Sequence, residues 1–186
     1  MSNSIFETPR NSKMGFDEVY FWTDTIKDWK PLLKSDGFNE IVINQLKWLV
    51  DKELICVYAF VLMPNHLHLI WEMLKFNGKE MPHASFNKWT SSQFLKLTRS
   101  NYPTLISGFQ EVAEDRKHRF WQRDPLAVAV TSRQMFEQKM DYIHLNPLQE
   151  KWSLALTPED YKWSSAKFYE EGIDEFGILT HYSDRF

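Results

Sequence analysis

Residues 54–73 read LICVYAFVLMPNHLHLIWEM, and this stretch decides the fold that we expect for the chain. Residues 54–62 are apolar and partly β-branched, which is typical of a buried strand. Met63-Pro64-Asn65 interrupts the run, and residues 66–73 predict a second strand. Two strands around so short a break predict a β-hairpin.

The segments on both sides of this hairpin supply the other elements. Propensity and apolar spacing predict strands over residues 19–23 and 118–130, and helices over residues 38–52, 85–99 and 132–145. Asn39 is the expected N-cap of the first helix and Ser132 that of the third. Pro125 interrupts the last strand, and Asn146-Pro147 closes the third helix because a residue before proline resists helix.

The resulting order, strand–helix–strand–strand–helix–strand, is that of the ferredoxin-like fold. We therefore predict an α+β protein whose antiparallel sheet carries its helices on one face. A third helix and an irregular, acidic tail follow this core. The predicted division is one main domain over residues 17–150 and a C-terminal extension over residues 151–186 that packs on it.

Composition limits the class of protein. Of 186 residues, 43% are apolar and 25% are charged, which is typical of a globular chain. A single cysteine, Cys56, excludes a disulfide framework and any site built from several cysteines, and it favours a reducing compartment. We expect no membrane span, since no apolar run approaches the required length of about 20 residues. The N-terminus lacks the pattern of a secretory signal, so we expect a cytoplasmic protein.

Charge is distributed unevenly along the chain. The net charge of −3 argues against a general binder of polyanions. However, residues 83–123 carry seven Lys and Arg against three Asp and Glu, while residues 147–186 carry four against eight. This distribution is compatible with a confined nucleic-acid site and equally with ordinary solvated surface charge.

The pair His66 and His68 is the sharpest chemical feature. Alternate residues of a strand share a face, so both imidazoles should project together from Cα atoms about 7 Å apart, and they can converge on one divalent cation. Leu67, Leu69 and Trp71 should then point into the core. Two ordinary histidines on the solvent side of a strand are the alternative.

A second feature lies at the end of the third predicted helix, where Tyr142 and Asn146 are four residues apart and hence on one helix face. A phenol beside a metal-bound phosphate can act as a nucleophile, and an amide oxygen suits Mg²⁺ or Mn²⁺ as a ligand. Considered alone, the pair fits better with a half-buried packing tyrosine and a helix C-cap.

Several stretches together resemble one family. They are FVLMPNHLHLI at 60–70, FWQRD at 120–124, DYIHLNP at 141–147 and PEDYKWSSA at 158–166. These residues resemble the single-tyrosine transposases with a His-hydrophobic-His motif. Within that family they are most similar to the transposase-like proteins associated with repetitive extragenic palindromes, which are bacterial. The resemblance covers residues 17–170.

The resemblance implies a role for each matching residue. His66 and His68 match the metal-ligand pair, Tyr142 matches the nucleophile, and Asn146 falls where relatives place a third ligand, often the longer Gln. It implies Mg²⁺- or Mn²⁺-dependent cleavage and rejoining of single-stranded DNA through a 5′-phosphotyrosine, acting in DNA transposition or repeat mobilisation. Residues 17–150 would be the catalytic domain.

The resemblance also implies partners and conditions. Single-stranded or hairpin DNA would be the substrate, the protein would associate with the nucleoid when bound to DNA, and relatives work either as homodimers or as monomers. Coordination requires neutral imidazole, so we expect activity to fall below about pH 6.

Residues that contact DNA are less directly indicated. Lys117, Arg119 and Arg123 are predicted phosphate contacts because of their charge and position. Trp121 is a predicted stacking partner for bases, together with Trp89 and Phe120, although core packing is the competing role of each ring.

Two other functions remain open at this point. The chain could be a catalytically inactive protein of the same fold that binds DNA hairpins. It could also be an unrelated metal hydrolase that uses His66 and His68. A covalent DNA adduct on Tyr142 separates the transposase hypothesis from both.

Overall fold

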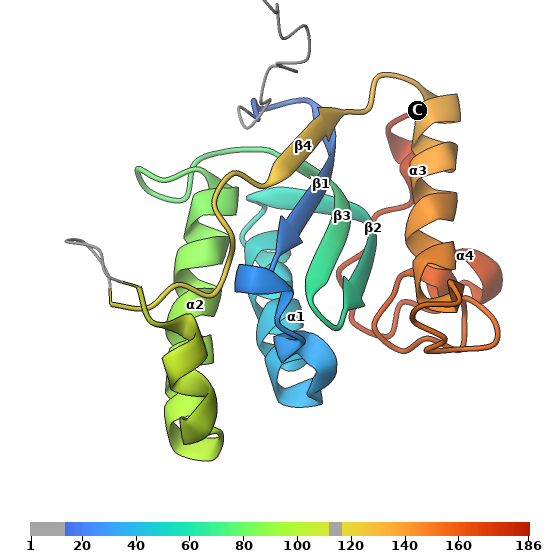
Figure 1. Ribbon diagram of the computed structural model, residues 1–186. Coiled ribbons are helices and arrows are strands. Elements are labelled where there is room, and N and C mark those ends of the chain that lie inside the picture. Colours follow the sequence, from blue (N-terminus) through green and yellow to red (C-terminus); the bar gives the residue numbers. More distant parts are fainter. Residues whose placement is uncertain (1–13, 112–116) are drawn as a thin grey trace, which may run out of the picture.

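The computed structural model of the protein describes residues 14–111 and 117–186. Its strands and longer helices follow one another as in Figure 1: β1 (Val19–Thr25), α1 (Asp36–Asp51), β2 (Ile55–Met63), β3 (His66–Met73), α2 (Pro82–Asn101), β4 (Leu126–Ala129), α3 (Arg133–Leu145) and α4 (Ala166–Glu171). Short 3-10 helices connect them: η1 (Lys27–Trp29), η2 (Leu32–Lys34), η3 (Pro103–Phe109), η4 (Asn146–Leu148) and η5 (Tyr182–Asp184).

The four strands form one sheet in the order β2-β3-β1-β4, and every neighbouring pair is antiparallel. This is the predicted ferredoxin-like, α+β arrangement, which is thereby confirmed. The β2–β3 hairpin is also confirmed, with Met63 paired to His66 across a turn of two residues, Pro64 and Asn65. Both central strands, β3 and β1, carry residues that line the site described below.

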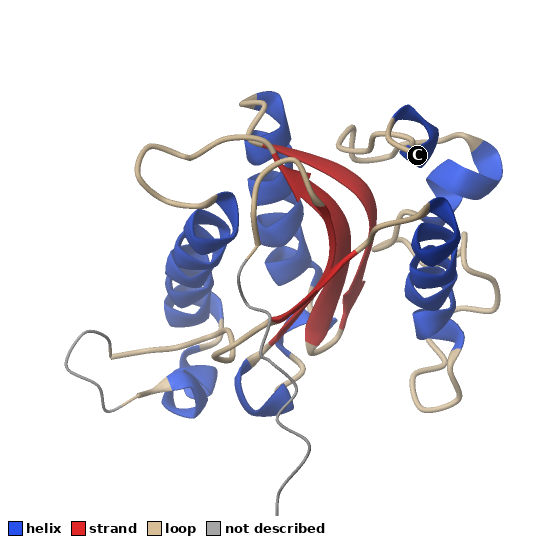
Figure 2. Cartoon of the chain, turned by 90° about the horizontal axis from the view of Figure 1, so that it is seen from above, coloured by secondary structure: helices blue, strands red, loops and turns tan. Residues whose placement is uncertain are grey.

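The sheet lies between two helical layers, with α1 and α2 on one face and α3 on the other (Figure 2). On the first face Trp22 and Trp71 stack at 4.8 Å and are fully buried. On the second face Phe136 and Ile143 of α3 pack against the sheet in a separate apolar cluster. The prediction of helices on one face therefore holds for α1 and α2, whereas α3 covers the opposite side.

Two predicted boundaries need correction. Helix α1 begins at Asp36, after Ser35 with its extended backbone, so Asn39 lies inside the helix and is not its N-cap. Asn39 is 1% exposed, because it occupies the buried face of the helix.

The strand predicted over residues 118–130 is reduced to β4. Phe120 and Trp121 are buried, and both belong to the core on the α1–α2 side of the sheet. Asp124 has a left-handed backbone with φ of 58°, and Pro125 follows it without an N–H group for pairing. The β-forming rings before this break therefore fill the core instead of extending the sheet.

The C-terminal residues pair with β2, which is an edge strand. The N–H of Leu62 donates to the carbonyl of Trp163, and the N–H of Thr180 donates to the carbonyl of Val57. These contacts occupy polar groups on an edge that would otherwise be open. No helix in the described parts of the chain is long and apolar enough to cross a membrane.

Candidate functional site

Strand β3 presents His66 and His68 on the face of the sheet that α3 covers. Their ring centroids are 4.7 Å apart, and the two residues are only 6% and 4% exposed. The intervening Leu67, like Leu69 and Trp71, is fully buried in the core on the other side. The alternation of the strand thus brings the two imidazoles together as predicted, in a buried place and not on the solvent side.

Hydrogen bonds fix the tautomer of His66. Asn65 Nδ2 donates to the carbonyl oxygen of Trp29 at 3.2 Å, which directs Asn65 Oδ1 to His66 Nδ1 at 2.7 Å. Because this amide oxygen can only accept, Nδ1 carries the proton. The lone pair of His66 is then on Nε2, the nitrogen left to bind a metal.

His68 is held in a similar way from β1. Its Nδ1 is 2.7 Å from Thr23 Oγ1, and Thr23 is its partner in the register of β1 and β3. Its Nε2 is buried and makes no hydrogen bond with the described residues. A buried polar atom without a partner is unfavourable, so this nitrogen is a candidate ligand atom.

Helix α3 brings Tyr142 and Asn146 to the same place. The helix begins with the predicted N-cap, since Ser132 Oγ accepts from the N–H of Met135. Asn146 follows the last residue of the helix but keeps a helical backbone, with φ of −58° and ψ of −44°, which preserves the spacing of four residues. The Tyr142 ring is 5.2 Å from that of His68 and is 46% exposed.

These side chains line one cavity of about 390 Å³. It is lined by Phe21, Thr23, Trp29, His66, His68, Leu126, Lys139, Tyr142, Asn146, Lys151 and Trp152. Asn146 is 2% exposed, and its Oδ1 has no hydrogen-bond partner in the described structure. The cavity therefore combines an exposed phenol with two unpartnered, buried polar atoms from different elements.

Burial lowers the pKa of both histidines. It lowers the pKa of His66 to about 4, with a smaller contribution from the charge of Lys151. It lowers the pKa of His68 to about 3, helped by His66, Lys139 and Lys151. Both imidazoles are thus neutral at pH 6. The pH below which protonation would prevent them from binding a metal is therefore lower than the value expected from free histidine.

The donor set fits a divalent cation. His66 and His68 offer nitrogen lone pairs, and Asn146 offers the amide oxygen that has no other partner. Within the described ranges, no three or more His, Cys, Asp and Glu side chains come together to hold a metal. Asn146 is a side chain of another type in the same cavity that could supply a third, oxygen ligand.

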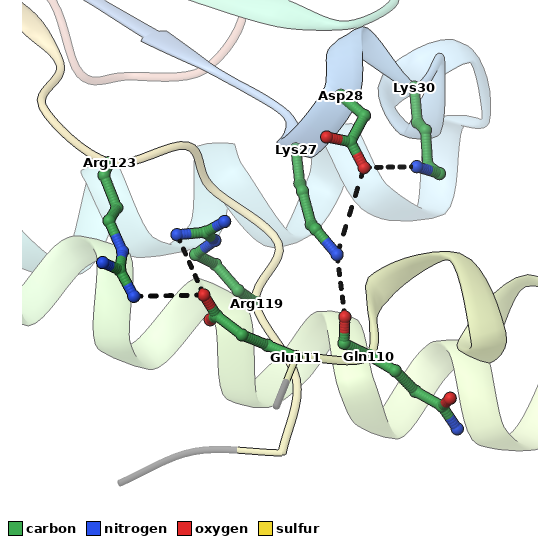
Figure 3. A network of polar contacts seen from close by, with 7 residues as sticks. All are labelled: Lys27, Asp28, Lys30, Gln110, Glu111, Arg119 and Arg123. Atoms are coloured by element: carbon green, nitrogen blue, oxygen red, sulfur yellow. Dashed lines mark hydrogen bonds and ion pairs between the residues drawn. The ribbon is translucent and has the colours of Figure 1, made fainter. Parts of the chain in front are cut away.

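Most of the side chains in segment 117–123 that were predicted to contact DNA contact other residues of the protein. Arg119 and Arg123 both pair with Glu111 Oε1 at 3.1 Å (Figure 3). Lys117 is exposed. Trp121 is 3% exposed and donates from Nε1 to Thr90 Oγ1, so in this structure its ring has the competing role, core packing.

The other two predicted stacking rings also lie away from the cavity. Phe120 is buried in the core. Trp89 is 39% exposed, but it lies on α2 and lines a different cavity, of about 620 Å³, beside α1. That cavity is on the opposite face of the sheet from His66 and His68.

Sequence reasoning missed several residues of the cavity wall, namely Thr23, Trp29, Lys139, Lys151 and Trp152. Lys139 could have been found, because it precedes Tyr142 by three residues and must share its helix face. The others come from segments whose position depends on the tertiary fold.

Of the comparisons with known proteins, only the one with solved structures found a match. No family model matches the chain, and no curated protein matches it. Among solved structures, a REP-associated tyrosine transposase bound to a REP hairpin is similar, with a TM-score of 0.59 and 16% sequence identity. The match covers 92% of this chain and 93% of that one. At this identity the likeness shows that the two proteins share a fold over nearly their whole lengths.

Proposed function

We propose that this protein is a transposase-like strand transferase that cleaves and rejoins single-stranded DNA through Tyr142. His66, His68 and Asn146 would hold Mg²⁺ or Mn²⁺. The observation that carries the proposal is the convergence of an exposed phenol, 5.2 Å from the His68 ring, with two buried ligand atoms that have no partner in the described structure. A fold shared with a hairpin-bound tyrosine transposase supports DNA as the substrate.

The chemistry assigned to the protein is a transesterification. Tyr142 Oη attacks phosphorus, the bond from phosphorus to the 3′ oxygen breaks, the phenol loses a proton and the leaving 3′ oxygen takes one up. A bound divalent cation would neutralise charge on the phosphate oxygens during this step. The ester bond is exchanged and not hydrolysed, so the reverse reaction rejoins strands without a nucleotide cofactor.

Two lysines give the cavity the charge that a phosphodiester requires. Lys139 Nζ is 4.9 Å from the centroid of Phe21, and Lys151 Nζ is 5.5 Å from that of Trp152. Both side chains line the cavity with Tyr142. Their positive charge would attract the backbone of a DNA strand and oppose the repulsion between a phenolate and a phosphate.

A denaturing gel tests the proposal. The protein is incubated with Mg²⁺ or Mn²⁺ and single-stranded oligonucleotides that carry a hairpin flanked by random sequence. A 5′-phosphotyrosine retains the 3′ part of the strand, so a 3′ label should move with the protein and a 5′ label should appear on a shorter free strand.

Variants assign the nucleophile. Tyr142→Phe should abolish the adduct, while the control Tyr182→Phe should keep it. An adduct that survives Tyr142→Phe refutes the assignment, and hydrolysis without any adduct favours the metal hydrolase instead. Binding of the hairpin with neither reaction favours the inactive hairpin-binding protein.

A further inference from the structure

We infer that Trp29 forms a stacking site for a nucleobase beside the metal-binding cavity; this inference rests on the proposed function. Trp29 belongs to η1, the short turn after β1, and it is 59% exposed. Its ring is 6.1 Å from that of His66, and it lines the cavity. A large apolar ring held at the entrance of such a cavity needs an explanation other than core packing.

The backbone that presents this ring is strained. Asp28 and Trp29 have φ values of 56° each, in the left-handed region that L-residues rarely adopt. Neither residue is glycine, so the conformation must be imposed by its surroundings. Strain of this kind persists where the structure over-determines it, and it is concentrated at functional positions.

Contacts on several sides hold the turn rigid. The N–H of Ile26 donates to the carbonyl of Asn65 at 2.8 Å, and the N–H of Lys27 donates to the carbonyl of Phe120 at 2.7 Å. Lys27 Nζ also donates to the carbonyl of Gln110, and Lys30 pairs with Asp28 at 2.8 Å (Figure 3). The backbone that carries the ring is thereby held in place before a ligand arrives, which reduces the entropy lost on binding.

Asn65 connects this turn directly with the metal-binding position. Its Nδ2 donates to the carbonyl of Trp29, and its Oδ1 accepts from Nδ1 of His66. One side chain thus contacts both the backbone of Trp29 and the imidazole of His66. A DNA strand with a phosphate near His66 would therefore bring an adjacent base to Trp29.

The second tryptophan at the cavity is less available for stacking. The Trp152 ring is 5.9 Å from that of His66, but Lys151 Nζ lies over it and the residue is half-buried. By contrast, the only ring contact of Trp29 within the described residues is the T-shaped one with His66. Trp29 is therefore the ring that can offer a face to a base.

Equilibrium binding of single-stranded DNA tests the inference. All proteins carry Tyr142→Phe, so that no covalent adduct distorts the equilibrium, and binding is followed by fluorescence anisotropy. One probe is a fluorescein-labelled oligothymidylate of about 20 nucleotides, longer than one site. The second probe is an abasic strand of the same length, which keeps the phosphates and lacks every base.

Trp29→Ala should weaken binding of oligothymidylate by about 5- to 150-fold and leave binding of the abasic strand within about 2-fold. Trp29→Phe should restore most of the loss, since a phenyl ring still stacks. Trp48→Ala is the matched control, because Trp48 is 42% exposed and lies on α1, across the sheet.

Each outcome is decisive. Equal losses on both probes, or equal losses for Trp29→Ala and Trp48→Ala, overturn the stacking site. An unchanged affinity of Trp29→Ala for oligothymidylate overturns it as well. If the Tyr142→Phe protein binds neither single-stranded probe nor a hairpin, the proposed function fails first, so the two failures are distinguishable.

Discussion

Replacing Asp24 by asparagine should make the protein more stable at pH 8 and leave its stability at pH 4 unchanged. Asp24 lies on β1, is fully buried, and accepts hydrogen bonds from Asn87 Nδ2 at 2.7 Å and from the N–H of Thr25 at 2.8 Å. Burial raises the pKa of its carboxyl group to about 7, although both hydrogen bonds favour the charged form. The carboxyl group is thus easier to protonate in the folded protein than in the unfolded chain.

The sign of the effect follows from proton binding. Between pH 4 and pH 7 the folded protein holds a proton on Asp24 that the unfolded chain has lost, so the free energy of unfolding falls as the pH rises. The loss is complete above pH 7. The difference between a pKa of 3.8 and one of about 7 corresponds to at most about 4 kcal/mol.

Buried histidines act in the opposite direction. The pKa values of His66, His68 and His144 are lowered to about 4, 3 and 4, chiefly by burial. Their neutral forms stabilise the fold above pH 6.5, and this contribution is lost as the pH falls toward those values. Both proteins share these groups, so their contribution cancels when the variant is compared with the wild type.

Asparagine has nearly the shape of aspartate and can keep the hydrogen bond from Thr25. Asn87 Oδ1 has no partner in the described structure, so a flipped Asn87 amide could accept from the new side chain. Urea unfolding at pH 4, 6 and 8 gives the free energies. The exposed Asp51→Asn is the control, and a difference between Asp24→Asn and wild type that is the same at pH 4 and pH 8 contradicts the reasoning.

Two further variants test the site and the fold. Asn65→Ala removes the partner of His66 Nδ1, so Mn²⁺ affinity measured by calorimetry should fall by about 10- to 100-fold; an unchanged affinity contradicts the role assigned to this hydrogen bond. Phe136→Ala empties a fully buried position of α3 stacked on Tyr182 at 4.7 Å, and chemical denaturation should show a loss of about 3–5 kcal/mol. A loss below about 1 kcal/mol would mean that α3 is not held by this ring.

Local patterns predicted much of the fold. The hairpin, the α3 helix with its Ser132 cap, and the shared face of His66 and His68 all depend on spacing within one segment. Periodicity alone did not predict that Tyr142 lies beside those histidines. Their proximity depends on α3 crossing the sheet face opposite α1 and α2, and the expectation came from a resemblance between motifs.

The site's aromatic residues could not be assigned in the same way. Phe120 and Trp121 are residues that favour strands, yet both rings fill the core. They lie just before Asp124-Pro125, where the backbone cannot continue a strand. Trp29 occupies a left-handed turn that contains no glycine or asparagine to indicate it. A backbone conformation imposed by contacts from Asn65 and Phe120 leaves no local pattern in the sequence.

The distribution of charge is the clearest case of a property that local sequence patterns do not predict. A window over residues 83–123 has four more cationic than acidic residues, which directed attention to Arg119 and Arg123. In the folded protein these two guanidinium groups share one carboxylate, that of Glu111, which offsets part of their charge. The cations that line the cavity, Lys139 and Lys151, come from α3 and from the acidic C-terminal part of the chain. Electrostatic potential depends on distance in space, so a local count along the sequence cannot show which charges a bound phosphate would meet.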